Sequence, residues 1–146
     1  MIILASEDIG LANPNALLMA TTTLQAIRTV GMPEGRIILS QCAVYLATSP
    51  KSNSTYAAIN KAMALVKETG NLSVPLEIRN APTKLMKDLN YGKGYQYAHN
   101  HQNNFVDFEF LPKEIAGTKF FEPSENPTEN KIADRMRQFW KEKYGY

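Results

Sequence analysis

Apolar residues recur at spacings of three and four through the first half of the chain, which is the period of an amphipathic helix. One such segment follows Asn13 and Pro14, an N-cap residue and a proline suited to the first helical position, and it ends at Gly31, suited to a left-handed C-cap. Its apolar stripe consists of Leu17, Ala20, Leu24 and Ile27. We expect a helix here, with this stripe along one side.

Two further helices are predicted before residue 71. Pro33 opens the first, which ends at Pro50 and turns inward Ile37, Ile38, Tyr45 and Leu46. Ser52 or Asn53 caps the second, which ends at Gly70 and has an apolar stripe of Tyr56, Ile59, Met63 and Val66. Because the connections are short, we expect the three helices to be antiparallel neighbours. Helices of this length are marginal alone in water, so their stripes must meet each other or a partner.

The second half of the chain is less regular until its last helix. A short helix is expected over residues 83–90, after a proline-containing connector, and an irregular segment rich in asparagine and aromatic residues covers 95–123. Within it, FVDFEF (105–110) alternates apolar and acidic residues, as an extended segment laid on a surface does. Asn126 and Glu129 stand in the two side-chain positions of a capping box around Pro127. The helix that follows has an aromatic face of Ile132, Met136, Phe139, Trp140 and Tyr144.

These elements predict a mainly α, single-domain chain over residues 1–146. The only cysteine, Cys42, excludes an internal disulfide and a cysteine-rich zinc site, and it suits a reducing, cytoplasmic setting with the thiol in the core. The opening MIILA is too short for a signal peptide or a membrane span. We interpret residues 1–8 as the end of a helix that starts outside this chain.

Positive charge concentrates in the middle of the sequence. The formal net charge is +2, but residues 51–101 hold seven Lys or Arg against three acids. The stretch 79–97 combines four of these cations with tyrosines, and its candidate DNA or interface contacts are Arg79, Lys84, Lys87, Tyr91, Lys93 and Tyr95. Four phosphate contacts give a logarithmic salt slope of only about −3 to −4, so any such grip is auxiliary. The alternative is that Arg79 and Asn80 bind backbone carbonyls at a bend while the tyrosines pack.

Catalytic chemistry has weak support in this sequence. The GKG at 92–94 lacks the strand, helix and Lys-Ser/Thr pair of a phosphate-binding loop. His99 and His101, followed by Asp107 and Glu109, allow a metal site or a free-standing enzyme to be drawn, but a histidine-rich surface loop explains them equally well. We therefore expect no catalytic residue, cofactor or metal in this chain.

Four long motifs carry a resemblance to a known family. They are ASEDIGLANPNAL (5–17), SPKSNSTYAAI (49–59), RNAPTKLMKDLNYGKGYQYAH (79–99) and FLPKEIAGTKFFEP (110–123). In this order they resemble the C-terminal domain of the MgsA/RarA family, the replication-associated recombination AAA+ ATPases that include the eukaryotic Werner-helicase-interacting protein. One departure is Asn90, where the family pattern leads us to expect glycine.

The resemblance implies a helical domain similar to the clamp-loader collar, which joins four subunits of a protein acting in DNA replication, recombination and repair at stalled forks. The ATPase module, with its ATP and Mg²⁺, then lies upstream of this chain. DNA and single-strand-binding protein are implied partners, and the protein is expected to be nucleoid-associated. From the residues themselves, Phe108, Phe110, Phe139 and Trp140 form more apolar surface than one such domain needs, so we take them as candidate oligomer contacts.

Overall fold

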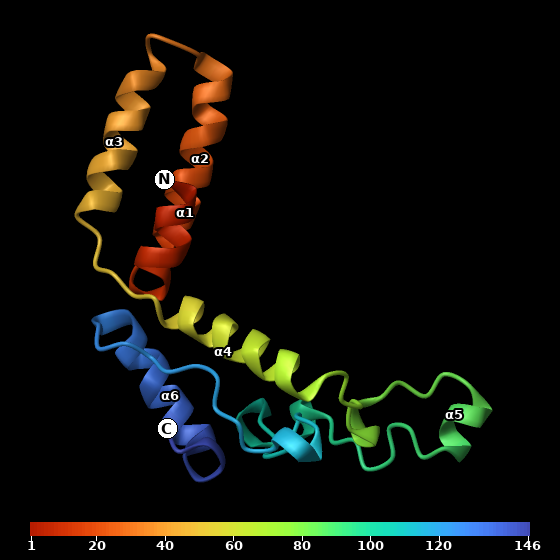
Figure 1. The fold of residues 1–146 in the computed structure, drawn as a ribbon. Coiled ribbons are helices and arrows are strands. Elements are labelled where there is room, and N and C mark those ends of the chain that lie inside the picture. Colours follow the sequence, from red (N-terminus) through yellow and green to blue (C-terminus); the bar gives the residue numbers. More distant parts are fainter. The chain divides into compact units, whose positions relative to one another are not determined.

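The computed structural model describes residues 1–146, apart from the side chain of Lys141. The chain is mainly helical, as predicted, and the described residues contain no strand. Its α-helices are α1 (Ile2–Leu4), α2 (Asn15–Val30), α3 (Gly35–Ala47), α4 (Ser54–Thr69), α5 (Lys84–Asp88) and α6 (Pro127–Tyr144) (Figure 1). A π-helical stretch, Ala5–Ile9, continues α1, and short 3₁₀ turns punctuate the segment between α4 and α6.

The residues form two compact units. The first unit comprises Met1–Met63 and Phe120–Asp134, and the second comprises Ala64–Lys119 and Arg135–Tyr146. Helices α4 and α6 each contribute residues to both units. The expectation that residues 1–146 act as one oligomerisation domain concerns assembly, and it stays a prediction.

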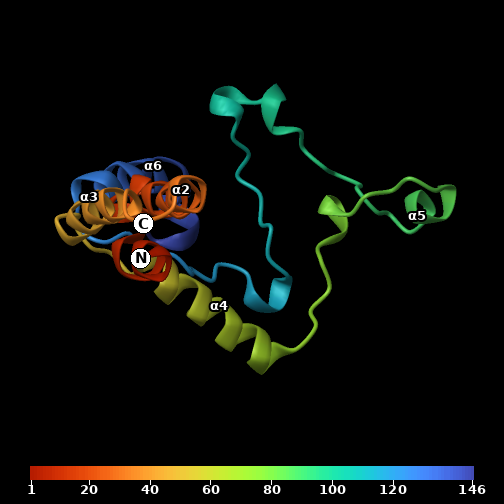
Figure 2. The same cartoon turned by 90° about the horizontal axis from the view of Figure 1, so that it is seen from above.

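Helices α2 and α3 form an antiparallel hairpin in the first unit, and α1 packs beside it (Figures 1 and 2). Gly31, with φ of 72°, ends α2 as predicted. The prediction that Pro33 opens the next helix was wrong by two residues. The N–H of Gly35 donates to the carbonyl of Gly31 at 2.8 Å, and this bond closes a turn that contains a cis Met32–Pro33 peptide before α3 begins.

The hairpin packs through small side chains. Its core consists of Ala5, Ile9, Ala16, Ala20, Cys42 and Leu46. Cys42 is therefore a core residue, as predicted, and Leu46 faces inward as predicted. Ile37 is exposed, so the expectation that it faces inward was wrong, and Leu17 and Leu24 of the α2 stripe are exposed as well. Alanines on one face of α2 let the two helices approach closely, and a residue one position along points about 100° away from that face.

Helix α4 does not join the hairpin as a third antiparallel neighbour, contrary to our prediction. The chain before it is tied to the N-terminal segment, because the N–H of Ser52 donates to the carbonyl of Asp8 at 2.8 Å. Gly10 allows this approach: its φ is 49°, and a Cβ there would lie 2.7 Å from the carbonyl oxygen of Ser52. The Ser52 hydroxyl accepts from the N–H of Ser54 at 3.2 Å and so begins α4, as predicted. The apolar stripe of α4 is exposed at Tyr56, Ile59, Met63 and Val66.

The carboxylate of Glu129 joins the start of α4 to the start of α6. Glu129 is 0% exposed, and it accepts hydrogen bonds from the N–H of Ser124 at 2.9 Å and from the Asn126 amide at 3.0 Å. The side chains of Ser52 and Ser54 also hydrogen-bond to it. The Asn126 side chain accepts from the N–H of Glu129 at 2.9 Å, which confirms the predicted capped start. In a standard capping box the Glu side chain accepts a hydrogen bond from the backbone N–H of the N-cap residue. Here the Glu129 carboxylate accepts instead from the N–H of Ser124 and from the side-chain amide of Asn126.

Burial alone raises the pKa of Glu129, but the hydrogen bonds from Ser52, Ser124 and Asn126 outweigh it, so the pKa lies below its ordinary value of 4.5. A depressed carboxyl pKa contributes stability above the pKa of the unfolded chain, and this contribution is lost as the pH falls through the folded-state pKa.

We expect Glu129→Gln to lower the free energy of unfolding at neutral pH by about 2 kcal/mol, because the buried hydrogen-bond donors lose part of a charged acceptor. Urea unfolding followed by circular dichroism measures this change. The variant should also lose less stability than the parent chain between neutral pH and pH 4. Glu125→Gln, at an exposed position four residues earlier, is the control. Equal unfolding midpoints for the parent chain and Glu129→Gln would contradict the assigned role.

Candidate functional site

Three of the predicted cations are free in the second unit. Lys84 and Lys87 lie on α5, whose N-cap is Thr83, and the Thr83 hydroxyl accepts from the N–H of Met86 at 3.3 Å. Lys93 lies in the turn that follows. All three side chains are exposed, and none of their ammonium groups forms an ion pair within the described part of the chain. They are therefore available to an anionic partner.

Arg79 and Tyr91 hold the local backbone. The Arg79 Nε donates to the carbonyl of Val74 at 2.7 Å, and its guanidinium lies 4.9 Å from the centroid of the Tyr91 ring. The N–H of Gly92 donates to the carbonyl of Leu76 at 2.7 Å, with φ of 70° at Gly92. These contacts favour the structural alternative for Arg79 and Tyr91. As DNA contacts, the six predicted residues of this stretch stay a prediction.

Asn90 takes a left-handed conformation, with φ of 63°. Asparagine tolerates this region better than other residues with a side chain, which explains how it stands where glycine is expected.

The FVDFEF segment lies against the C-terminal part of α6. The ring of Phe105 lies 4.7 Å from those of Phe139 and Trp140, measured between centroids. The acids of the segment bind α6: Asp107 forms an ion pair with Lys143 at 2.6 Å, and Glu109 accepts from the Tyr144 hydroxyl at 3.1 Å. The predicted alternation therefore separates the acidic side chains from the apolar ones.

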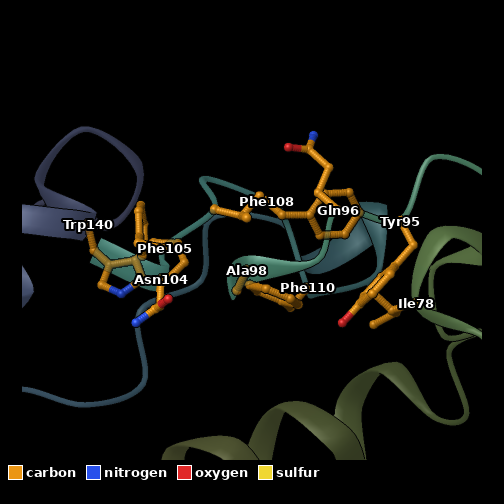
Figure 3. A pocket seen from close by; sticks show the side chains of 10 residues that line it. Ile78, Tyr95, Gln96, Ala98, Asn104, Phe105, Phe108, Phe110 and Trp140 are labelled. Atoms are coloured by element: carbon orange, nitrogen blue, oxygen red, sulfur yellow. The ribbon is translucent and has the colours of Figure 1, made fainter. Parts of the chain in front are cut away.

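The apolar side chains of this segment line a pocket of about 160 Å³, which we call the aromatic pocket (Figure 3). Its walls are Ile78, Tyr95, Gln96, Ala98, Asn104, Phe105, Val106, Phe108, Phe110 and Trp140. Among the candidate oligomer contacts, Phe108, Phe139 and Trp140 are half-buried and Phe110 is 49% exposed. The structure brings these four together in one cluster, and their role between subunits stays a prediction.

Glu109 and Tyr144 shift each other's titration. Burial alone raises the pKa of Glu109, but hydrogen bonds from the N–H groups of Leu111 and Gly117 and from Tyr144 bring it below 4.5. Burial raises the pKa of Tyr144 to about 12, with help from the negative charge of Glu109 and the hydrogen bond to it. At neutral pH the Glu109 carboxyl is therefore ionised and accepts the hydrogen bond, and the Tyr144 phenol is protonated and donates it.

The residues considered for a metal site or a nucleotide site have other contacts in the structure. His99 packs on Tyr97 at 5.0 Å, and Asp107 and Glu109 are engaged by α6. No group of three metal-ligating side chains occurs among the residues described. Residues 91–94 form a turn with neither a strand before it nor a helix directly after it, so they do not fit nucleotide phosphates. No helix in the described chain is long and apolar enough to cross a membrane.

A family model described as "MgsA AAA+ ATPase C terminal" matches residues 1–140. The chain belongs to this family. It is 42% identical over 139 residues to replication-associated recombination protein A of Coxiella burnetii, covering 94% of this chain and 32% of that protein. The corresponding protein of Escherichia coli is 41% identical over 134 residues, covering 91% of this chain and 30% of its own length.

A eukaryotic relative, ATPase WRNIP1 of Dictyostelium discoideum, is 45% identical over 123 residues, which is 84% of this chain and 14% of that protein. The chain thus spans about a third or less of these members of the MgsA C-terminal family. The resemblance drawn from the four motifs is confirmed.

Sequence reasoning missed that Ile78, Gln96 and Asn104 line the aromatic pocket of this family member. These residues come from separate 3₁₀ turns and loops, and no periodic pattern connects them to Trp140. The alternation of FVDFEF and the aromatic face of the last helix were the sequence signals that pointed to this surface.

We expect Glu109→Gln to lower the pKa of Tyr144 from about 12 toward its ordinary value of 10, because the substitution removes the negative charge beside the phenol. The difference in tyrosinate absorbance between each protein and its own Tyr144→Phe variant, followed against pH, isolates this titration. Glu114→Gln, at an exposed position in the same segment, should leave it unchanged. An unaltered Tyr144 midpoint in Glu109→Gln would show that the carboxylate does not act on the phenol.

Proposed function

We propose that this chain is the non-catalytic oligomerisation domain of a replication-associated recombination AAA+ ATPase and that it assembles its copies into a tetramer. The observation that carries the proposal is the exposed apolar stripe of α4. Ile59 is 56% exposed and Met63 64% exposed, and Tyr56 and Val66 continue the same stripe. Burying one side chain of this kind contributes roughly 1.5–3 kcal/mol, so a partner that covers the stripe gains several kcal/mol.

A second copy fits this surface well. The stripe runs from Tyr56 to Val66, eleven residues of helix that extend over about 15 Å. The hairpin adds further exposed aliphatic side chains on a different element, at Leu18, Met32, Ile37 and Val44. Two unlike apolar surfaces on one chain suit the head-to-tail contacts that close a ring.

The names of the relatives support a role in a larger machine. Two are called replication-associated recombination proteins and one is called an ATPase. In the proposed whole protein an upstream module binds ATP and Mg²⁺ in the cytoplasm, and the domain described here holds several such modules around DNA at stalled replication forks. Single-strand-binding protein is a proposed partner of that assembly.

Light scattering of this chain tests the assembly, and we expect the mass of a tetramer at high micromolar concentration. Ile59→Glu and Met63→Glu should reduce the mass toward that of a monomer, because each places a charge in the contact. Ala57→Glu is the matched control, since Ala57 is exposed on the same helix and lies more than about 100° around it from the centre of the stripe. A monomer at high micromolar concentration would overturn the proposal.

We also propose, as a second function, that the lysines of the second unit make auxiliary contacts to DNA. The observation that favours it is charge: the unit holds eleven Lys or Arg against seven Asp or Glu, a formal +4, and Lys84, Lys87 and Lys93 are free of acidic partners among its described side chains. Such contacts release counterions and weaken with salt.

Replacing Lys84 and Lys87 together by Ala should weaken binding to single-stranded DNA and reduce the logarithmic salt slope by about 1.4, since each phosphate contact on a single strand contributes about 0.7. Fluorescence anisotropy of a labelled oligonucleotide at several salt concentrations measures both quantities. Lys113→Ala, at an exposed lysine outside the 79–97 stretch, is the control. Absence of binding at low salt would remove this second function.

A further inference from the structure

We propose that the aromatic pocket binds one unstacked base of a single-stranded nucleic acid. This inference rests on the proposed DNA contact of the second unit and assigns to it a site and a ligand class. All the residues that line the pocket belong to that unit.

The size and walls of the pocket suit a single planar ring. Its volume of about 160 Å³ is smaller than the roughly 300–1,000 Å³ of pockets for cofactors and drug-sized ligands. Phe105 and Trp140 form one end of the pocket, with ring centroids 4.7 Å apart in an edge-to-face contact (Figure 3). Phe110 and Tyr95, which are 49% and 58% exposed, leave ring surface open to a ligand. Nucleobases stack on such rings with little regard to sequence.

The polar groups at the pocket suit the edges of a base. Gln96 and Asn104 contribute the two amide side chains of its lining, and each amide can both donate and accept hydrogen bonds. The lining contains no charged residue. The two acids of the neighbouring segment are held by Lys143 and Tyr144, so neither carboxylate belongs to the surface that a base would enter.

Charge complementarity favours a nucleic acid over an apolar protein segment. The second unit carries the +4 described above, whereas the first unit, with five Lys or Arg and seven acids, carries −2. Lys93 lies two residues before Tyr95, so their Cα atoms are at most about 7 Å apart. The exposed side chain of Lys93 is therefore within reach of a phosphate that flanks a base bound at Tyr95.

Trp140 provides the readout, because it is the only tryptophan in the chain and it lines the pocket. The experiment compares oligothymidylate with an abasic oligonucleotide of equal length at low salt. We expect both to bind through the lysines, but only oligothymidylate to bind with quenching of Trp140 fluorescence. Tyr95→Ala and Phe110→Ala should weaken oligothymidylate binding about tenfold or more and change the affinity for the abasic strand less than twofold.

Two variants keep the test specific. Tyr95→Phe retains the ring and should preserve oligothymidylate binding. Tyr97→Ala removes an exposed tyrosine that packs on His99 outside the pocket and should leave both affinities unchanged. Thermal melting by circular dichroism establishes that each variant is folded before its affinity is compared.

Three other results would each overturn the proposed base pocket, and they differ in what they leave standing. Equal affinity for the two oligonucleotides without quenching would overturn the base pocket while leaving the lysine contacts in place. Failure of both oligonucleotides to bind would overturn the proposed DNA contact and the pocket with it. A change in Trp140 emission with protein concentration alone, insensitive to added oligonucleotide, would assign the pocket to a side chain of a second copy and would also overturn the proposal.

Discussion

The first unit depends on one buried negative charge. The Glu129 carboxylate stays ionised without solvent because donors from two distant parts of the chain, residues 52–54 and 124–126, converge on it. A buried carboxylate with only some of these partners is unfavourable, so the two segments are stable together or not at all. The starts of α4 and α6 are thereby determined by one interaction, and the core of small residues in the hairpin does not have to specify them.

The same unit contains few large side chains in its core. Ala16 and Ala20 bring α2 close to α3, and this close approach turns leucines and isoleucines of both helices outward. Such packing makes a tight hairpin from little apolar volume, and it leaves apolar area uncovered. The stability of the hairpin and the proposed self-association therefore both follow from the presence of alanine at positions 16 and 20 of the helix interface.

The positions of α2, α4 and α6 along the chain were predictable because most of their boundaries depend on local chemistry: Gly31, Gly70, Ser52 and the Asn126–Glu129 pair act within a few residues. The predicted N-cap role of Asn13 was wrong, because α2 has no side-chain cap hydrogen bond and the Asn13 amide donates instead to the hydroxyls of Tyr45 and Ser49. The faces that these helices bury were not predictable. Ala16 and Leu17 are adjacent apolar residues of α2, and nothing in the sequence indicates that Ala16 meets α3 while Leu17 stays exposed. Arg79 was equally ambiguous, since its carbonyl partner on Val74 lies in a loop without a periodic pattern. The aromatic pocket required residues spread over positions 78 to 140 to line one cavity, and no local signal encodes that arrangement.

Gly10 carries a consequence for how this domain can be altered. Its backbone crosses the Ser52 carbonyl so closely that even alanine would force the two segments apart, and its positive φ disfavours every residue with a side chain. Random mutagenesis of the domain should return this position unchanged among folded variants, while the exposed aliphatic positions of the hairpin accept polar replacements. In a genetic screen, loss of function through a substitution at position 10 therefore reports a folding defect, whereas loss through a substitution at an exposed aliphatic position reports a lost contact with a partner.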